Sequence, residues 1–178
     1  MTNKPNNSGW IEVICGNMFS GKTEELIRRL RRAEIARLSV AIFKPKIDTR
    51  YEEGNIVSHN QIQLKSLLVE SAAEIAPLAK DADVVGIDEV QFFDERIITT
   101  AKDLAVNGKR VIIAGLDTDF RGVPFGPMPG IMCEADYLDK LQAICIVCGN
   151  PASYTQRLTK EAAQVVIGET DIYEARCR

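Results

Sequence analysis

The chain has 178 residues, of which 46% are hydrophobic and 26% are charged, and this is enough apolar material for one sizeable core. Its 22 basic and 25 acidic side chains leave a net charge of −3, a balance that does not favour a nucleic-acid or membrane binder. The polar start of the chain lacks the apolar run of a signal peptide, and no stretch approaches the ~20 apolar residues of a membrane helix. We therefore expect a cytoplasmic protein with no nucleic-acid or membrane partner.

The first two thirds of the chain alternate between predicted strands and helices. Residues 10–15 (WIEVIC) predict a strand, and residues 23–38 predict a helix because apolar residues recur there at helical spacing. Further strands are predicted over 39–44, 83–88 and 110–116, helices over 71–80 and 93–107, and a long polar loop over 47–61. This alternation indicates a parallel sheet with helices packed on it.

A run of four closely spaced arginines lies within the first predicted helix, at Arg28, Arg29, Arg31 and Arg32. They could form a basic surface for nucleic acid, or they could lie on a solvated face and form salt bridges. We favour the second interpretation because charge runs on helices usually face solvent.

The composition changes after residue 116. Residues 117–130 are rich in glycine and proline and predict irregular backbone, whereas short strands are predicted from residue 140 onward. The later part also holds the pair Cys145-x-x-Cys148, which in a reducing compartment is more readily a metal or redox site than part of a disulfide framework. We therefore divide the chain into a polar N-terminal segment (1–9), an α/β domain (10–138) and a small β subdomain (139–178).

A phosphate-binding loop is predicted where the first strand meets the first helix. Residues 16–23 (GNMFSGKT) match the pattern G-x-x-x-x-G-K-[ST]. The glycines allow backbone N–H groups to wrap phosphates, the lysine can reach the β- and γ-phosphates of ATP, and the threonine hydroxyl suits Mg²⁺. The candidate ATP contacts are Gly16, Asn17, Met18, Phe19, Ser20, Gly21, Lys22 and Thr23.

Two adjacent acids end the predicted strand over 83–88. Asp88 follows an apolar run and, beside a phosphate-binding loop, is expected to hold Mg²⁺. Glu89 could act as a base toward a hydroxyl or water, or it could be only a second acid near the metal. The chain has no [NT]-K-x-D segment for guanine, and it is short for a motor, so a small kinase is the favoured class. A non-catalytic ATP-binding module that acts on nucleic acid is the alternative.

Four segments carry a family resemblance: residues 16–23 (GNMFSGKT), 43–51 (FKPKIDTRY), 87–93 (IDEVQFF) and 115–126 (GLDTDFRGVPFG). On these motifs the chain resembles the type II thymidine kinases from residue 10 almost to its end. The resemblance implies a P-loop NTPase (RecA-like) α/β fold, with helices packed on a parallel sheet, and a small C-terminal zinc-binding β subdomain. One departure is Asn17, where the family usually carries proline. Because that position contributes backbone to the loop, we expect little consequence.

The resemblance implies transfer of the ATP γ-phosphoryl group to the 5′-hydroxyl of thymidine or deoxyuridine, in nucleotide salvage. It makes Glu89 the base that takes the 5′-hydroxyl proton, keeps Asp88 at Mg²⁺ and places Gln91 beside the nucleotide. Asp48 and Arg50 match a mobile loop of the family. Arg50 is then a candidate for stabilising charge on the transferring phosphoryl group, or simply a surface arginine that anchors the loop.

The same resemblance implies a nucleoside pocket. Its expected walls are Met18, Leu116, Phe120 and Phe125, and aromatic rings among them suit a flat base. Tyr173 and the tail segment match a family loop that grips the base largely through backbone groups; the tail candidates are Gln164, Val165, Val166, Ile167 and Gly168. By resemblance we also expect a homotetramer that is inhibited by deoxythymidine triphosphate.

A structural zinc ion is expected from the resemblance as well. Cys145, Cys148 and Cys177 match three of the four zinc ligands of the family, and Cys-x-x-Cys is a common part of tetrahedral thiolate sites. The fourth family ligand, a Cys or His, lies a few residues beyond the third, whereas the sequence given stops at Arg178. We expect either that the intact protein continues or that the site is weakened. His59 and Cys133 are not expected to substitute.

Overall fold

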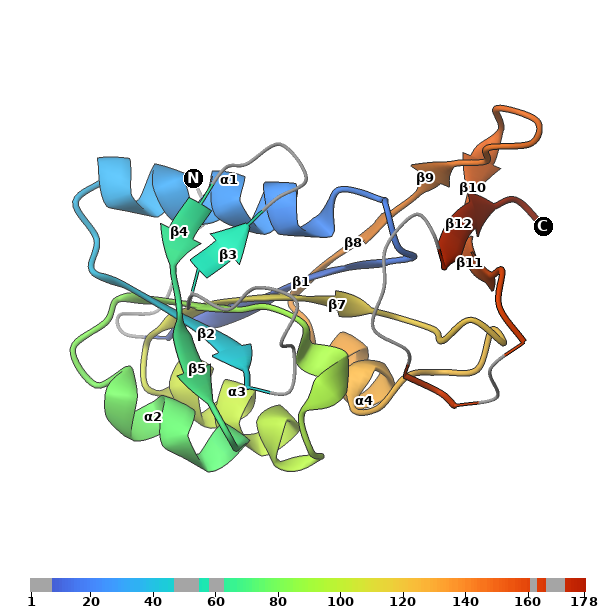
Figure 1. Ribbon diagram of the computed structural model, residues 1–178. Helices are drawn as coiled ribbons and strands as arrows, with labels where there is room; N and C mark the ends of the chain where they lie inside the picture. Colours follow the sequence, from blue (N-terminus) through green and yellow to red (C-terminus); the bar gives the residue numbers. More distant parts are fainter. Residues whose placement is uncertain (1–7, 47–54, 58–62, 161–162, 166–171) are drawn as a thin grey trace.

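A six-stranded parallel sheet forms the centre of the protein (Figure 1). The computed structural model describes residues 8–46, 55–57, 63–160, 163–165 and 172–178, with only the backbone at 55–57 and 63. The sheet order is β5-β2-β6-β7-β1-β8, and each neighbouring pair is parallel. The strands are β1 (Trp10–Gly16), β2 (Val40–Pro45), β5 (Leu67–Val69), β6 (Val84–Ile87), β7 (Arg110–Leu116) and β8 (Tyr137–Leu141).

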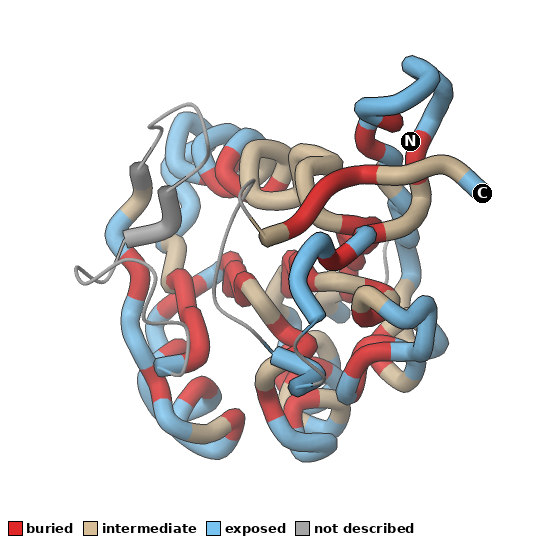
Figure 2. Tube along the Cα trace, turned by 45° about the vertical axis from the view of Figure 1, so that its right-hand side comes forward, coloured by how far each residue is buried: buried red, intermediate tan, exposed pale blue. Residues whose placement is uncertain are grey.

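Helices cover both faces of this sheet. Helix α1 (Lys22–Ile35) lies on one face, while α2 (Ile75–Leu78), α3 (Arg96–Val106) and α4 (Met128–Glu134) lie on the other (Figure 1). Two separate apolar clusters result, one on each face, and the buried residues of the central strands run between them (Figure 2). None of the helices in the described part of the chain is both long and apolar enough to cross a membrane.

Smaller elements surround the sheet. Single 3₁₀ turns, η1 (Ala72–Glu74) and η2 (Val90–Phe92), precede α2 and α3, and β3 (Asn55–Val57) pairs antiparallel with β4 (Gln63–Lys65). Beyond β8, the chain forms two short antiparallel pairs: β9 (Ala143–Ile144) with β10 (Pro151–Ala152), and β11 (Tyr154–Arg157) with β12 (Tyr173–Arg176). These pairs form the small β-rich part that the sequence predicts.

The predicted βαβα alternation is confirmed, with four central strands and the helices α1 and α3 where they are expected. The helix predicted over 71–80 is confirmed in place but is shorter, and it consists of the 3₁₀ turn η1 followed directly by the four-residue α2. Helix α4 lies partly in the segment predicted to be irregular, and β3 lies in the predicted loop, of which residues 47–54 and 58–61 are outside the described residues. Since β8 extends the main sheet to Leu141, the division at 138/139 stays a prediction.

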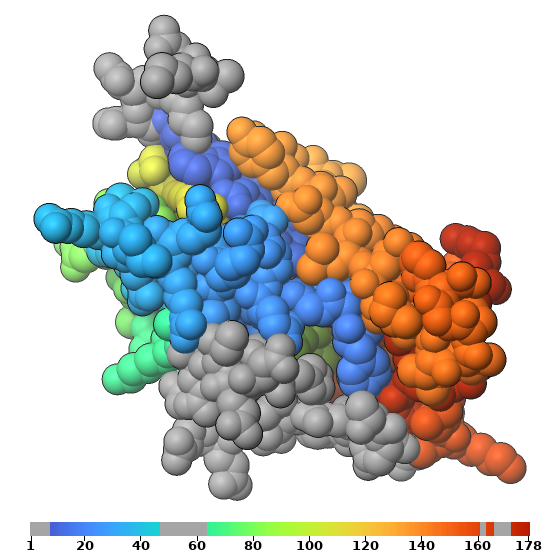
Figure 3. Space-filling model, turned by 90° about the horizontal axis from the view of Figure 1, so that it is seen from above, coloured from blue at the N-terminus to red at the C-terminus, as the bar shows by residue number. Residues whose placement is uncertain are grey.

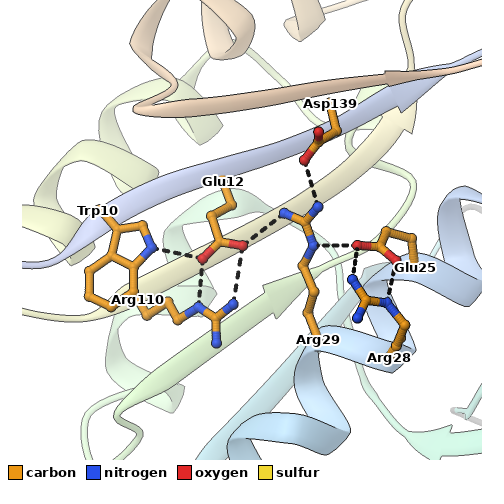
Figure 4. A network of polar contacts seen from close by, with 7 residues as sticks. All are labelled: Trp10, Glu12, Glu25, Arg28, Arg29, Arg110 and Asp139. Atoms are coloured by element: carbon orange, nitrogen blue, oxygen red, sulfur yellow. Dashed lines mark hydrogen bonds and ion pairs between the residues drawn. The ribbon is translucent and has the colours of Figure 1, made fainter. Parts of the chain in front are cut away.

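A buried carboxylate ties α1 to three strands (Figure 4). Glu12 of β1 is 7% exposed and accepts hydrogen bonds from the Trp10 indole (2.7 Å), Arg29 (2.8 Å) and Arg110 (2.6 Å). Arg29 also pairs with Glu25 and with Asp139 of β8. The salt-bridge interpretation of the helix arginines is thus confirmed for Arg29, and likewise for Arg28, which pairs with Glu25.

Replacing the central acid should destabilise the fold. Glu12→Gln leaves the Arg29 and Arg110 guanidinium groups without their anionic partner in a largely buried position. We expect a loss of about 3 kcal/mol in the free energy of unfolding, measured by urea denaturation at pH 7. Glu34→Gln, on the exposed side of α1, is the matched control and should change stability by no more than about 0.5 kcal/mol.

The wild type and Glu12→Gln should also differ in how their stability depends on pH. Burial alone would raise the pKa of Glu12, but hydrogen bonds from Arg110, Trp10 and Arg29 outweigh it and hold that pKa below its usual value. The carboxylate therefore contributes stability above the unfolded pKa of about 4.3, and this contribution disappears as the pH falls through the lower folded pKa. Glu12→Gln should lose less stability than the wild type between pH 5 and acid pH; equal losses would contradict this role.

Candidate functional site

The phosphate-binding loop leaves β1 and enters α1 as the sequence predicts. Gly16 ends the strand with a φ of 143°, and a Cβ there would lie 2.3 Å from the carbonyl oxygen of Leu141. Gly21 has a φ of 83° and precedes the first residue of α1, and Phe19 is also left-handed at 66°. The loop therefore curls over the helix N-terminus, where backbone N–H groups attract anions.

Lys22 folds back over this loop. Its Nζ donates to the carbonyl oxygen of Asn17 at 2.6 Å and approaches the Ser20 hydroxyl at 3.5 Å. Desolvation lowers the pKa of Lys22, while the carboxylates of Glu89 and Asp88 act in the opposite direction. An ammonium group held among oxygens in this way is placed to bind a phosphate that enters the loop.

The two predicted acids face the loop from the end of β6. Asp88 is 5% exposed, and its Oδ2 lies 3.4 Å from the Thr23 hydroxyl, which donates to it. Burial, together with the neighbouring charge of Glu89, raises the pKa of Asp88 to about 7. A hydroxyl and a carboxylate at the edge of a phosphate-binding loop are the ligands that Mg²⁺ takes in P-loop proteins, so these residues fit that ion.

Glu89 is held by its own backbone and by Gln91. It has a left-handed backbone (φ 53°, ψ 40°), which is uncommon for a residue with a side chain, and its N–H donates to Asp88 Oδ1 at 3.0 Å. Gln91 Nε2 donates to Glu89 Oε2, while Gln91 Oε1 accepts from the Leu116 N–H at 3.0 Å. Gly126 lets its loop pass close by, since a Cβ there would lie 2.4 Å from the Gln91 carbonyl oxygen. The Glu89 carboxylate is therefore fixed beside Asp88.

The predicted nucleoside residues gather in two places. Phe120 and Tyr173 come together around the guanidinium of Arg157. Phe125 is 8% exposed and meets Phe92 edge to face, with ring centroids 5.7 Å apart.

The remaining candidates connect these places to the loops. Gln164 donates a hydrogen bond to Asp119 (3.1 Å) in the loop that follows β7. The Met18 N–H of the phosphate-binding loop donates to Thr155 (3.0 Å). Val165 is 48% exposed. Asp48, Arg50, His59, Val166, Ile167 and Gly168 lie outside the described residues.

Three sulfurs cluster in the C-terminal part. The Sγ atoms of Cys145, Cys148 and Cys177 all lie within 4.8 Å of one another, and those of Cys148 and Cys177 are 3.5 Å apart. Sulfurs around a tetrahedral zinc ion at about 2.3 Å would be spaced by about 3.8 Å, so the cluster fits zinc. Cys133 is exposed on α4 and does not belong to the cluster.

The surroundings of the three thiols differ, and those of Cys145 favour binding of a cation. Backbone N–H groups of Cys177, Val147 and Cys148 directed at Cys145 lower its pKa to about 6, which favours the thiolate form that binds metals. Hydrogen bonding with the Cys148 and Cys145 sulfurs raises the pKa of Cys177 to about 11. Among the described residues the cluster supplies three thiol ligands.

Comparison with known proteins decides the family. The sequence model of the family described as thymidine kinase matches residues 9–178. Thymidine kinases from Rhodothermus sp. (strain ITI 518) and Bacteroides fragilis (strain YCH46) are 59% and 57% identical over 170 residues; these cover 96% of this chain and 80% and 85% of the relatives. The chain belongs to the thymidine kinase family. A solved structure of AMPPCP-bound DnaA from Aquifex aeolicus aligns with 76% of this chain and 42% of its own, at a TM-score of 0.48 and 18% identity, too low to bear on function.

Asn17 stands where the family usually carries proline, and its side chain makes contacts that its sequence context does not indicate. Its backbone carbonyl does receive Lys22, but its side chain, 1% exposed, also bridges to the C-terminal part. Nδ2 donates to the carbonyl oxygen of Tyr154 (3.2 Å), and Oδ1 accepts from the Ala143 N–H (3.3 Å). Proline could form neither bond. The C-terminal residues accordingly lie against the loop end of α1 (Figure 3).

Sequence reasoning missed several residues that the structure brings to the site. Thr155 and Arg157 on β11 contact the loop residue Met18 and the predicted pocket residues, respectively. Asp117 is 5% exposed, pairs with Lys140 at 2.6 Å and acts electrostatically on Lys22 of the phosphate-binding loop. The signals were faint: an acid after an apolar strand for Asp117, and nothing local for the others.

Removing the Asn17 side chain should weaken the join between loop and C-terminal part. Asn17→Ala leaves the Ala143 N–H and the Tyr154 carbonyl without their partner, so we expect a loss of about 1–3 kcal/mol in the free energy of unfolding. Urea denaturation measures this, with the exposed Asn150→Ala as the control. A midpoint equal to that of the wild type would show that the bridge contributes nothing.

Proposed function

We propose that this chain transfers the γ-phosphoryl group of ATP to the 5′-hydroxyl of thymidine, and also of deoxyuridine, to give the monophosphate in nucleotide salvage. The observation that carries the proposal is the meeting of a phosphate-binding loop with two adjacent acids, Thr23 lying 3.4 Å from Asp88 with Glu89 next in the chain. Membership of the thymidine kinase family supports the choice of acceptor.

The residues of the site then have separate roles in the reaction. The loop N–H groups and Lys22 bind the β- and γ-phosphates, and Thr23 and Asp88 would hold Mg²⁺, which when bound neutralises phosphate charge. Glu89 takes the proton of the 5′-hydroxyl, and Gln91 keeps its carboxylate in place. Arg50 is proposed to stabilise the transferring group, by resemblance alone.

The nucleoside is proposed to lie between the loop after β7 and the C-terminal tail. Met18, Leu116, Phe120 and Phe125 would form its walls, with Tyr173 and the backbone of residues 164–168 gripping the base. The contact between Gln164 and Asp119 supports this arrangement, because it joins the described part of the tail to the loop that carries Phe120.

The finer proposals rest on the family. We propose a cytoplasmic homotetramer that is inhibited by deoxythymidine triphosphate. The edge strand β8 offers a surface for a second copy, since Tyr137 and Leu138 are 57% and 47% exposed there. Sedimentation of the purified protein tests the assembly.

Replacing the proposed base should separate binding from chemistry. Glu89→Gln is nearly isosteric but cannot accept the proton, so kcat should fall by roughly a hundredfold or more while ATP and thymidine still bind. A coupled assay with thymidine, together with calorimetric titration of both ligands, measures this. The exposed Glu95→Gln is the control and should keep wild-type rates.

Two outcomes would contradict the proposal. Near-normal turnover of Glu89→Gln would leave Glu89 a structural acid. ATP hydrolysis by the wild type that responds to DNA or RNA and not to thymidine would instead favour a nucleic-acid ATPase.

Zinc is proposed to fasten the C-terminal part. Cys148→Ser should lower the zinc content, measured by elemental analysis, and should weaken thymidine binding before ATP binding, because the cluster lies in the part of the chain that carries the tail. Cys133→Ser, outside the cluster, should retain the metal. Wild-type protein with clearly less than one zinc per chain and full activity would rule out a structural metal.

A further inference from the structure

Arg157 lies where three separate segments of the chain meet. It belongs to β11, pairs directly with Tyr173 of β12 and is only 5% exposed. Its guanidinium carbon lies 3.6 Å from the centroid of the Phe120 ring and 5.2 Å from that of Tyr173. The first distance is that of direct stacking, and cation–π attraction is strongest where both groups are shielded from water.

The same guanidinium also binds the tail. Nη2 donates to the Tyr173 hydroxyl (2.7 Å) and to the carbonyl oxygen of Gln164 (2.9 Å), and Nη1 donates to the carbonyl oxygen of Ala163. Only arginine offers several N–H donors in a rigid planar fork that can also stack on a ring. Lysine would keep the charge without this geometry.

We propose that Arg157 is a positioning residue of the nucleoside pocket, which holds the Phe120 ring, the Tyr173 hydroxyl and the backbone of residues 163 and 164 in one arrangement before the base binds. The proposal rests on the proposed function, which places these groups around the base. Since Arg157 covers one face of Phe120, at most one face of that ring is left to stack on a base. A pocket arranged in advance loses less conformational freedom on binding, which favours affinity for the nucleoside and leaves ATP unaffected.

Substitution of Arg157 should therefore weaken the binding of thymidine and leave the binding of ATP unchanged. Arg157→Met should raise the KM for thymidine at least tenfold, with the KM for ATP within twofold of the wild type. Arg157→Lys should restore only part of the loss. Arg121→Met is the matched control: Arg121 also lies over Phe120, at 5.4 Å, but its side chain is half-exposed and pairs with Asp119 rather than with the tail, so both KM values should stay within threefold.

A second measurement does not depend on activity. In the ligand-free protein, amide hydrogen exchange at residues 163–165 should be at least tenfold faster in Arg157→Met than in the wild type, and unchanged in Arg121→Met. If Arg157→Met does not fold, Arg157→Lys carries both measurements with smaller changes in the same direction.

Three results would overturn the inference. They are unchanged exchange at 163–165, an unchanged KM for thymidine, or an equal rise in both KM values with a lower melting temperature, which would indicate general loss of folding. Failure of the proposed function looks different: the wild type itself would not phosphorylate thymidine, while faster exchange in Arg157→Met would still show that Arg157 holds the tail.

Discussion

The shared register of β6, β7 and β1 is the constraint on which the site depends. Ile113 of β7 is level with Val13 of β1 on one side and with Ile87 of β6 on the other. Because all three strands run in the same direction, β1 enters the phosphate-binding loop at the edge where β6 delivers the two acids. Thr23 and Asp88, 65 positions apart in sequence, meet there without any special loop to bring them together.

The C-terminal part completes this site through a few directed contacts and little apolar burial. Its own core is small, with four buried residues: Ala143, Cys145, Ala152 and Ala175. It is joined to the phosphate-binding loop by Asn17 and by the Met18–Thr155 bond, and to the loop after β7 by Arg157. Hydrogen bonds are directional, so these contacts fix the orientation of the C-terminal part better than a non-directional apolar contact of equal size would.

What the sequence could predict was whatever is encoded locally. The phosphate-binding loop and Asp88 follow from a short motif and an apolar strand, whereas the nucleoside pocket came only from the family resemblance. Helix α4 was missed because Pro127 and Pro129 suggest irregular backbone, although proline is well tolerated in the first turn of a helix. The three-residue strands β3, β4 and β5 are too short to show a period.

Arg157 shows the limit of prediction from sequence. Its partners come from three segments of the chain, and none of the motifs that indicate the family contains Arg157. The Asn17 side chain was overlooked for a similar reason. Its amide reaches Tyr154 and Ala143, which are more than 120 positions away in sequence, so no local pattern indicates these contacts.

The charges of the site explain why it needs such support. Asp88, Glu89 and Asp117 all act on the Lys22 ammonium, so three carboxylates share one loop cation. Burying a carboxylate is costly, and more so beside a like charge: burial first and the neighbouring Glu89 second raise the pKa of Asp88. Lys140 offsets one of the three through its pair with Asp117, which raises the pKa of Lys140, while Lys44 and Lys22 act on Asp88. Since Lys140 belongs to β8, the strand that leads into the C-terminal part, the charge balance around Lys22 and the position of that part depend on the same stretch of chain.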